Sequence, residues 1–128
     1  MKTFDLMFCC LGNGITVCDR RQEESGDYKT VAHIAEWGGL RIRDKRLRND
    51  LEAFARLQAQ AASKADKERA RFFRLPYAAQ YELWYESMTL SQQLHDRNTW
   101  PVEKSPEWLY SQYIRNSNRK HGYEMPTA

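Results

Sequence analysis

The stretch that decides the fold is residues 4–17, which read FDLMFCCLGNGITV. Apolar residues alternate along it from Phe4 to Cys10, and this period of two is typical of a β-strand. Asn13-Gly14 then predicts a tight hairpin turn, because both residues tolerate a positive φ. A two-residue turn at this pair would place Cys10 opposite Val17. Both faces of the first strand are largely apolar, which favours a central position for it in the sheet.

A second hairpin is predicted downstream of a polar loop that runs from Asp19 to Asp27. Its strands are residues 28–34 and 40–43, and Gly38-Gly39 supplies the turn. That turn would pair Glu36 with Arg41 across the two strands. We therefore expect an antiparallel meander of three to four strands.

Beyond Arg43 the apolar period becomes that of a helix. The spacing of three and four is kept by Leu47, Leu51, Phe54, Leu57, Ala61 and Ala65. Either Asp44 or the pair Asn49 and Glu52, which has capping-box spacing, can begin this helix. Pro76 predicts a boundary between two helices, since proline ends one helix and suits the first turn of the next.

The C-terminal part adds one more helix, which Ser105-Pro106 would begin. The sequence thus predicts an α+β fold, an N-terminal antiparallel β-meander of three to four strands followed by three to four α-helices. We expect a single domain over residues 1–128, with a β-sheet half at 1–43, a helical half at 44–122 and a loose tail at 123–128.

Charge and hydropathy indicate which partners and which cellular compartment to expect. The net charge of +3 is too balanced to indicate nucleic-acid binding by itself. No stretch approaches the roughly 20 apolar residues that cross a bilayer. We expect a cytoplasmic protein without a membrane partner.

Two charged segments are candidate binding sites. The acidic loop carries Glu23, Glu24 and Asp27, and a basic cluster follows it with Arg41, Arg43, Lys45, Arg46 and Arg48. Clustered cations contact phosphates, but long basic side chains also simply solvate strand edges and helix faces. Further basic clusters lie at residues 64–74 and 115–121, and the sequence leaves open whether the clusters share one surface.

An aromatic stripe marks the helical half, with Tyr77, Tyr81, Trp84 and Tyr85 at helical spacing. One interpretation is core packing against the sheet. The other is a partner-facing patch, because Tyr and Trp are enriched at interface hot spots. Tyr81, Trp84 and Tyr85 are the candidates for such an interface.

Catalytic motifs are missing from the sequence. There is no phosphate-binding glycine loop and no Gly-x-Ser-x-Gly elbow, and the three histidines are far apart in the chain. Cys9, Cys10 and Cys18 are interpreted as reduced strand residues, and an enzyme would need one of them activated by His33. We expect no enzymatic activity, no cofactor and no metal site.

Residues 4–20 and 26–34 resemble a group of small accessory proteins encoded on conjugative and other mobile elements of Firmicutes. Some proteins of such elements inhibit CRISPR–Cas effectors. The resemblance implies an anti-CRISPR protein, a stoichiometric inhibitor of a CRISPR–Cas or similar host defence nuclease. Its partner would be a Cas nuclease or its guide complex, bound by the acidic loop or the basic cluster. The alternative is a nucleic-acid-binding accessory or regulatory protein of the element, and homodimerisation stays open.

Overall fold

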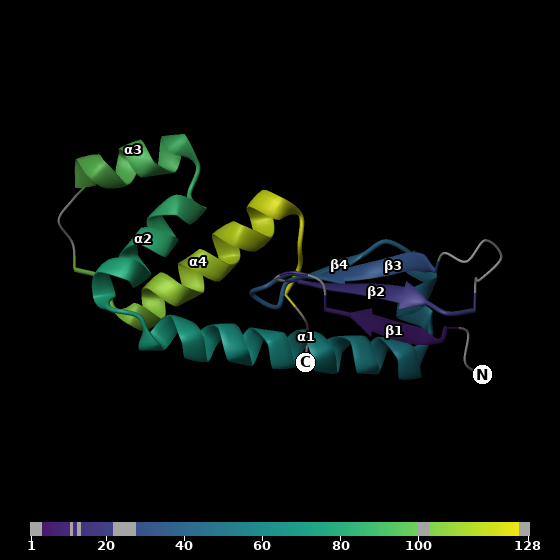
Figure 1. The fold of residues 1–128 in the computed structure, drawn as a ribbon. Helices are drawn as coiled ribbons and strands as arrows, with labels where there is room; N and C mark the ends of the chain where they lie inside the picture. The colour runs from purple at the N-terminus through teal and green to yellow at the C-terminus, as the bar shows by residue number, and fades with distance from the viewer. Residues whose placement is uncertain (1–3, 11, 13, 22–27, 100–102, 126–128) are drawn as a thin grey trace. The chain divides into compact units, whose positions relative to one another are not determined.

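The computed structural model describes residues 4–10, 12, 14–21, 28–99 and 103–125, without the side chains of residues 96–99. The elements follow the order of an α+β fold, four strands and then helices, as predicted (Figure 1). The chain divides into two compact units, Met1–Glu68 with Glu124–Ala128, and Arg69–Tyr123. The first unit holds the described strands and the second holds helices, and the long helix α1 (Leu51–Arg74) contributes residues to both.

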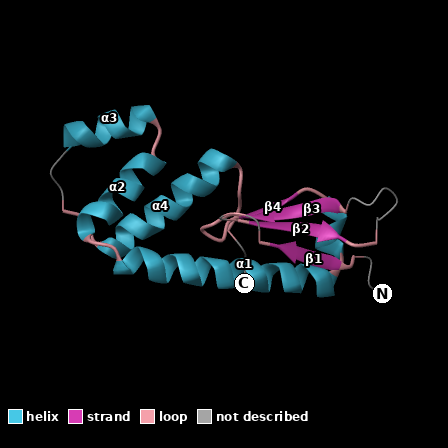
Figure 2. Ribbon diagram, viewed as in Figure 1, coloured by secondary structure: helices cyan, strands magenta, loops and turns pink. Residues whose placement is uncertain are grey.

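The sheet of the first unit is an antiparallel meander in the order β1-β2-β3-β4 (Figure 2). The strands are β1 (Leu6–Cys9), β2 (Ile15–Asp19), β3 (Lys29–Ile34) and β4 (Leu40–Ile42). The predicted meander is confirmed, but the central position predicted for the first strand is wrong. Each strand of a meander pairs with its neighbours in sequence, so the first strand lies at an edge.

The register of the first hairpin differs from the predicted one by two residues. Phe8, rather than Cys10, lies opposite Val17, so the connection is longer than two residues. Gly12 has a φ of 69° within this connection, whereas Asn13 lies outside the described residues. A shift of two keeps the period of the strand, so the same side chains still face the core.

The second hairpin also has a longer turn than predicted. Arg41 lies opposite His33, so the predicted pairing of Glu36 with Arg41 is wrong. The hairpin closes where the Ala35 N–H donates to the Gly39 carbonyl at 2.8 Å. Three residues therefore form the loop, a length that requires a residue in the left-handed region at its end.

Gly38 meets this requirement with a φ of 89°. The Gly38 N–H donates to the Ala35 carbonyl at 2.9 Å. A Cβ at this position would lie 2.5 Å from the Cβ of Ala65 on α1. The turn thus needs glycine for two reasons, its backbone angle and the close approach of the helix.

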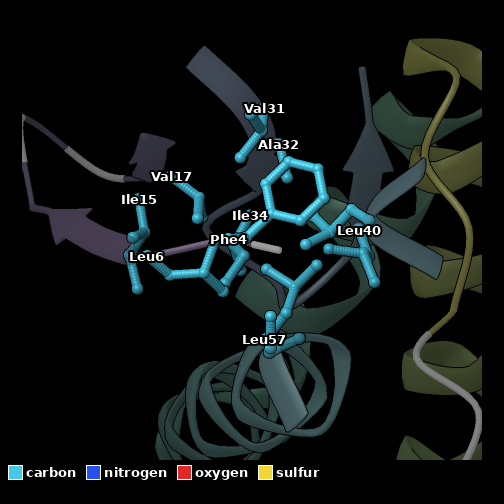
Figure 3. Close-up of a cluster of buried hydrophobic side chains, with 12 residues drawn as sticks. Phe4, Leu6, Ile15, Val17, Val31, Ala32, Ile34, Leu40 and Leu57 are labelled. Atoms are coloured by element: carbon cyan, nitrogen blue, oxygen red, sulfur yellow. The ribbon is translucent and has the colours of Figure 1, made fainter. Parts of the chain in front are cut away.

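The core of the first unit lies between the sheet and the first part of α1 (Leu51–Arg74) (Figure 3). Its buried members are Phe4, Leu6, Ile15, Val17, Val31, Ala32, Ile34, Leu40, Leu47, Ala53, Leu57 and Ala61. Leu57 is fully buried, but Leu51 is 82% exposed, so the prediction that places Leu51 on the apolar face is wrong. Leu51 is the first residue of the helix, and its side chain points away from the core.

The start of α1 follows neither of the two predicted caps. Asp50 accepts the Ala53 N–H at 3.2 Å through its side chain, and this caps the helix. Asp44 instead caps the short 3₁₀-helix η1 (Lys45–Asn49) that precedes α1. The other oxygen of Asp50 accepts the Phe4 N–H at 2.9 Å, which ties the N-terminal segment to the helix start.

The second unit contains α2 (Tyr77–Ser87), α3 (Leu90–Thr99) and α4 (Pro106–His121). The boundary predicted at Pro76 is confirmed, and so is the start at Ser105, whose side chain accepts the Trp108 N–H. Phe72, Trp84, Met88 and Leu109 form the buried cluster of this unit.

The sequence predicts a loose tail at residues 123–128. Within it, Glu124 forms an isolated antiparallel bridge with Leu40 of β4, and residues 126–128 lie outside the described part. Among the helices that the structure describes, none combines the length and the apolar character needed to cross a membrane.

Candidate functional site

Basic residues gather at one end of the sheet. Because β3 and β4 are antiparallel, the start of β3 at Lys29 lies beside the end of β4. The N–H groups of Arg43 and Asp44 both donate to the Val31 carbonyl, at 2.8 and 3.1 Å. These bonds fix the chain where it leaves the sheet and enters η1.

A cavity of about 250 Å³ opens at this place, and we call it the basic hollow. Its lining consists of Lys29, Thr30, Arg43, Asp44, Lys45 and Arg46. Four cationic side chains thus surround one carboxylate and one hydroxyl, and none of the lining residues is apolar.

Asp44 is the carboxylate of the basic hollow, and its side chain is only 8% exposed. The Arg46 guanidinium donates two hydrogen bonds to it, from Nε to Oδ1 at 3.0 Å and from Nη2 to Oδ2 at 2.7 Å. Lys29 Nζ lies 3.7 Å from the same Oδ2. The hydrogen bonds from Arg46 lower the pKa of Asp44 to about 2, so the carboxylate stays ionised at neutral pH.

Arg43 and Lys45 are in a different situation. Both side chains are exposed, and neither forms an ion pair with another residue that the structure describes. Within the described part of the chain no carboxylate engages their charges, whereas that of Arg46 is largely engaged by Asp44.

A second arginine–aspartate pair lies next to this region. Asp19 is fully buried. Arg21 donates two hydrogen bonds to its carboxylate, from Nε to Oδ1 at 3.0 Å and from Nη2 to Oδ2 at 2.7 Å. Burial opposes ionisation, but the hydrogen bonds from Arg21 lower the pKa of Asp19 overall. The guanidinium carbons of Arg21 and Arg46 lie 4.9 and 5.9 Å from the centre of the Phe4 ring, so one ring contacts both cations.

The five residues of the predicted basic cluster do not all come together. Arg43, Lys45 and Arg46 line the basic hollow. Arg41 lies on β4 opposite His33. Burial of His33 lowers its pKa, and the nearby positive charges of Arg41 and Arg43 lower it further. Arg48 forms an ion pair with Glu124, and its guanidinium carbon lies 5.7 Å from the centre of the Phe54 ring.

Sequence reasoning missed Lys29 and Thr30, which line the basic hollow, and Arg21. The pairing of β3 with β4 is the signal that could have placed Lys29 and Thr30 beside Arg43. The predicted acidic loop residues Glu23, Glu24 and Asp27 lie outside the described residues.

The aromatic stripe is divided between core and surface. Trp84 is 3% exposed and packs with Phe72 of α1 and Leu109 of α4, so its cluster partners come from helices. Tyr81 and Tyr85 are half-buried, with ring centres 6.4 Å apart and nearly parallel.

The three cysteines are free thiols, with Cys9 half-buried, Cys10 exposed and Cys18 buried. Removal from water, together with the neighbouring Cys18, raises the pKa of the Cys9 thiol. In the part of the chain that the structure describes, no three His, Cys, Asp or Glu side chains are placed to hold a metal ion.

Comparisons of this chain with protein-family models, with curated proteins and with solved structures found no match. The resemblance to mobile-element proteins therefore remains a sequence-based hypothesis. Among the described residues, the basic hollow brings four cationic side chains around one carboxylate.

Proposed function

We propose that the protein is a non-catalytic binding protein whose basic hollow holds phosphate groups of a nucleic acid. The observation that carries this proposal is the lining, in which Lys29, Arg43, Lys45 and Arg46 face a single carboxylate. Arg46 and Lys29 already neutralise that carboxylate, Asp44. A phosphate entering the basic hollow would therefore meet a clear excess of positive charge.

The exposed pair Arg43 and Lys45 would make the first contacts. Neither side chain would have to give up an ion pair with a described residue in order to bind. Asp44 orients the Arg46 guanidinium through two hydrogen bonds. The Thr30 hydroxyl can donate a hydrogen bond to a phosphate oxygen. Phosphate contacts of this kind give affinity and register without reading sequence.

The lining favours a phosphate over a protein surface. Specific protein interfaces have a core enriched in aromatic and apolar side chains and depleted in charge. The basic hollow has the opposite composition, since none of its six lining residues is apolar. We therefore place the nucleic-acid-binding alternative ahead of a purely protein-directed inhibitor.

The inhibitor expected from the resemblance remains a narrower form of this proposal. In that form the phosphates would belong to the guide RNA of a Cas complex, and binding would block the nuclease stoichiometrically. The mobile-element setting and the CRISPR–Cas target rest on the resemblance alone.

The test is the salt dependence of binding to labelled DNA and RNA of arbitrary sequence, followed by fluorescence anisotropy from about 50 to about 200 mM salt. We expect a steep fall of affinity with salt. The double variant Arg43→Ser/Lys45→Ser should weaken binding equally for all sequences and reduce the logarithmic salt slope by about 2. The matched control is Arg20→Ser/Arg56→Ser, which removes the same charge from exposed positions that belong to none of the predicted basic clusters and do not line the basic hollow.

Equal losses in the two double variants would refute the basic hollow and indicate a general effect of net charge. Absence of salt-dependent binding in the parent protein would refute nucleic-acid binding altogether. A separate pull-down from a lysate with CRISPR–Cas systems tests the narrower form. Capture of a Cas complex by the parent protein but not by Arg43→Ser/Lys45→Ser would support it, whereas equal capture by both would count against the phosphate assignment.

A further inference from the structure

A second cavity lies in the helical unit, and it is larger than the basic hollow. Its volume is about 430 Å³, within the range of small-molecule sites. We call it the aromatic hollow, and it is lined by Trp84, Met88, Ser91, Gln92, His95, Trp108, Gln112 and Asn116. Its residues come from the C-terminal end of α2 and from α3 and α4.

Two tryptophans, together with Met88, form the apolar part of the aromatic hollow. Their ring centres are 5.3 Å apart and their planes are inclined by 62°. Trp84 is 3% exposed, whereas Trp108 is 41% exposed and can offer part of its ring to a ligand. Trp108 lies in the first turn of α4, where its backbone N–H donates to the Ser105 hydroxyl oxygen at 3.2 Å.

The charge around these rings disfavours a cationic ligand. Among the described side chains that line the aromatic hollow, none is an acid, a lysine or an arginine. Lys104 Nζ lies 4.9 Å from the centre of the Trp84 ring and 5.7 Å from that of Trp108. A cationic ligand would have to share these rings with an existing cation, and the described lining offers it no carboxylate.

The polar part of the aromatic hollow consists of three amides, Gln92, Gln112 and Asn116, together with Ser91 and His95. The side-chain Oε1 of Gln92 accepts the Thr89 backbone N–H at 3.0 Å, which leaves the side-chain NH₂ group of Gln92 as a donor. The Asn116 NH₂ group donates to Ser87 at 3.2 Å and is buried. The Gln112 amide makes no side-chain hydrogen bond with the described residues, so it can both donate to and accept from a ligand.

We propose that the aromatic hollow binds a nucleobase, stacked on Trp108 and hydrogen-bonded along its edge by Gln112. A base is neutral and planar, and its edge carries both donors and acceptors, which Asn and Gln amides read in other proteins. This inference deepens the proposed function, because the choice of a base among neutral rings rests on nucleic-acid binding.

The test is equilibrium dialysis of the full chain with labelled adenosine, which carries a base but no phosphate. We expect saturable binding with one site per chain. Trp108→Ala should weaken it about tenfold, the usual loss when a stacking ring is removed. Gln112→Leu should weaken it about fivefold, the loss expected for one hydrogen bond.

Glu107→Gln is the matched control, since Glu107 is exposed beside Trp108 and does not line the cavity. It should bind adenosine as the parent protein does. Circular dichroism of each variant checks the fold, and Gln112→Leu keeps the test decisive if Trp108→Ala unfolds the helical unit. Unchanged affinity in a folded Gln112→Leu variant would overturn the assigned contact.

Further results would overturn the proposal as a whole. One is the absence of saturation up to about 5 mM adenosine, well above a millimolar dissociation constant. Another is equally strong binding of methyl glucoside or of choline, which would indicate a sugar or a cation site. The variant Arg43→Ser/Lys45→Ser should retain adenosine binding, so failure of the basic hollow and failure of the aromatic hollow give different results.

Discussion

Replacement of Asp44 by asparagine should have opposite effects on stability and on nucleic-acid binding. The substitution keeps an oxygen that can accept the Arg46 N–H, which Asp44 binds at 3.1 Å, but it removes the negative charge. Each pKa unit corresponds to about 1.4 kcal/mol. Lowering the pKa of Asp44 from 3.8 to about 2 therefore sets an upper limit of about 2.5 kcal/mol on its contribution to folding.

Solvent reduces this value. The Asp44 side chain is 8% exposed, but that of its partner Arg46 is 66% exposed, so water screens the ion pair. We expect Asp44→Asn to lower the free energy of unfolding by about 1 to 1.5 kcal/mol at neutral pH. Urea denaturation of the two proteins measures this difference.

The pH dependence has a defined sign. The folded state lowers the pKa of Asp44, so its contribution is complete above the unfolded value of 3.8 and disappears as the pH falls through about 2. About half of the difference between the parent and Asp44→Asn should be lost at about pH 3. The control is Asp66→Asn on the exposed face of α1, which should change stability by less than about 0.5 kcal/mol.

The same variant adds one net positive charge to the basic hollow. Its affinity for DNA should rise several-fold at low salt, with a logarithmic salt slope that is steeper by about 1. A stability difference that does not vary between pH 7 and pH 3 would refute the reasoning about the ion pair. A fall in DNA affinity would mean that the rigid placement of Arg46 matters more than the charge of the basic hollow.

Two further predictions concern the core and the second hairpin. Leu57→Ala should destabilise the protein by about 2 to 5 kcal/mol, whereas Leu51→Ala, on an 82% exposed residue of the same helix, should have an effect below about 0.5 kcal/mol. Similar costs in urea denaturation would contradict the assignment of the buried face. Gly38→Ala should cost more than about 1 kcal/mol, because it adds a Cβ 2.5 Å from that of Ala65 at a positive φ. Full stability of that variant would mean that the turn does not need glycine.

Local signals in the sequence predicted the elements well. Alternation gave the strands, and Pro76 and Ser105 marked helix boundaries, because each signal acts within one turn of the backbone. The registers of both hairpins were wrong because they depend on loop length. In the second hairpin the position of the left-handed glycine and the approach of α1 at Ala65 set that length. A residue pattern does not contain the second of these factors.

The candidate site was predictable to a similar extent. The run from Arg41 to Arg48 is visible in the sequence, but only part of it surrounds the basic hollow. Lys29 joins it through strand pairing, and Arg48 leaves it through an ion pair with Glu124, which is distant in the chain. Both changes are long-range, so no local period or spacing could indicate them.

The two aspartate–arginine pairs explain how a basic surface can be rigid as well as charged. In each pair the aspartate accepts the backbone N–H of the residue two positions later at 3.1 Å, and the guanidinium of that residue grips the carboxylate at 2.7 Å. The segments are Asp19-Arg20-Arg21 and Asp44-Lys45-Arg46, so the same local arrangement occurs twice beside Phe4. The paired arginine loses its side-chain freedom when the protein folds, and a ligand does not have to order it again. In the second segment the middle residue, Lys45, remains exposed and unpaired among the described residues, so one short motif supplies a fixed cation and a free one.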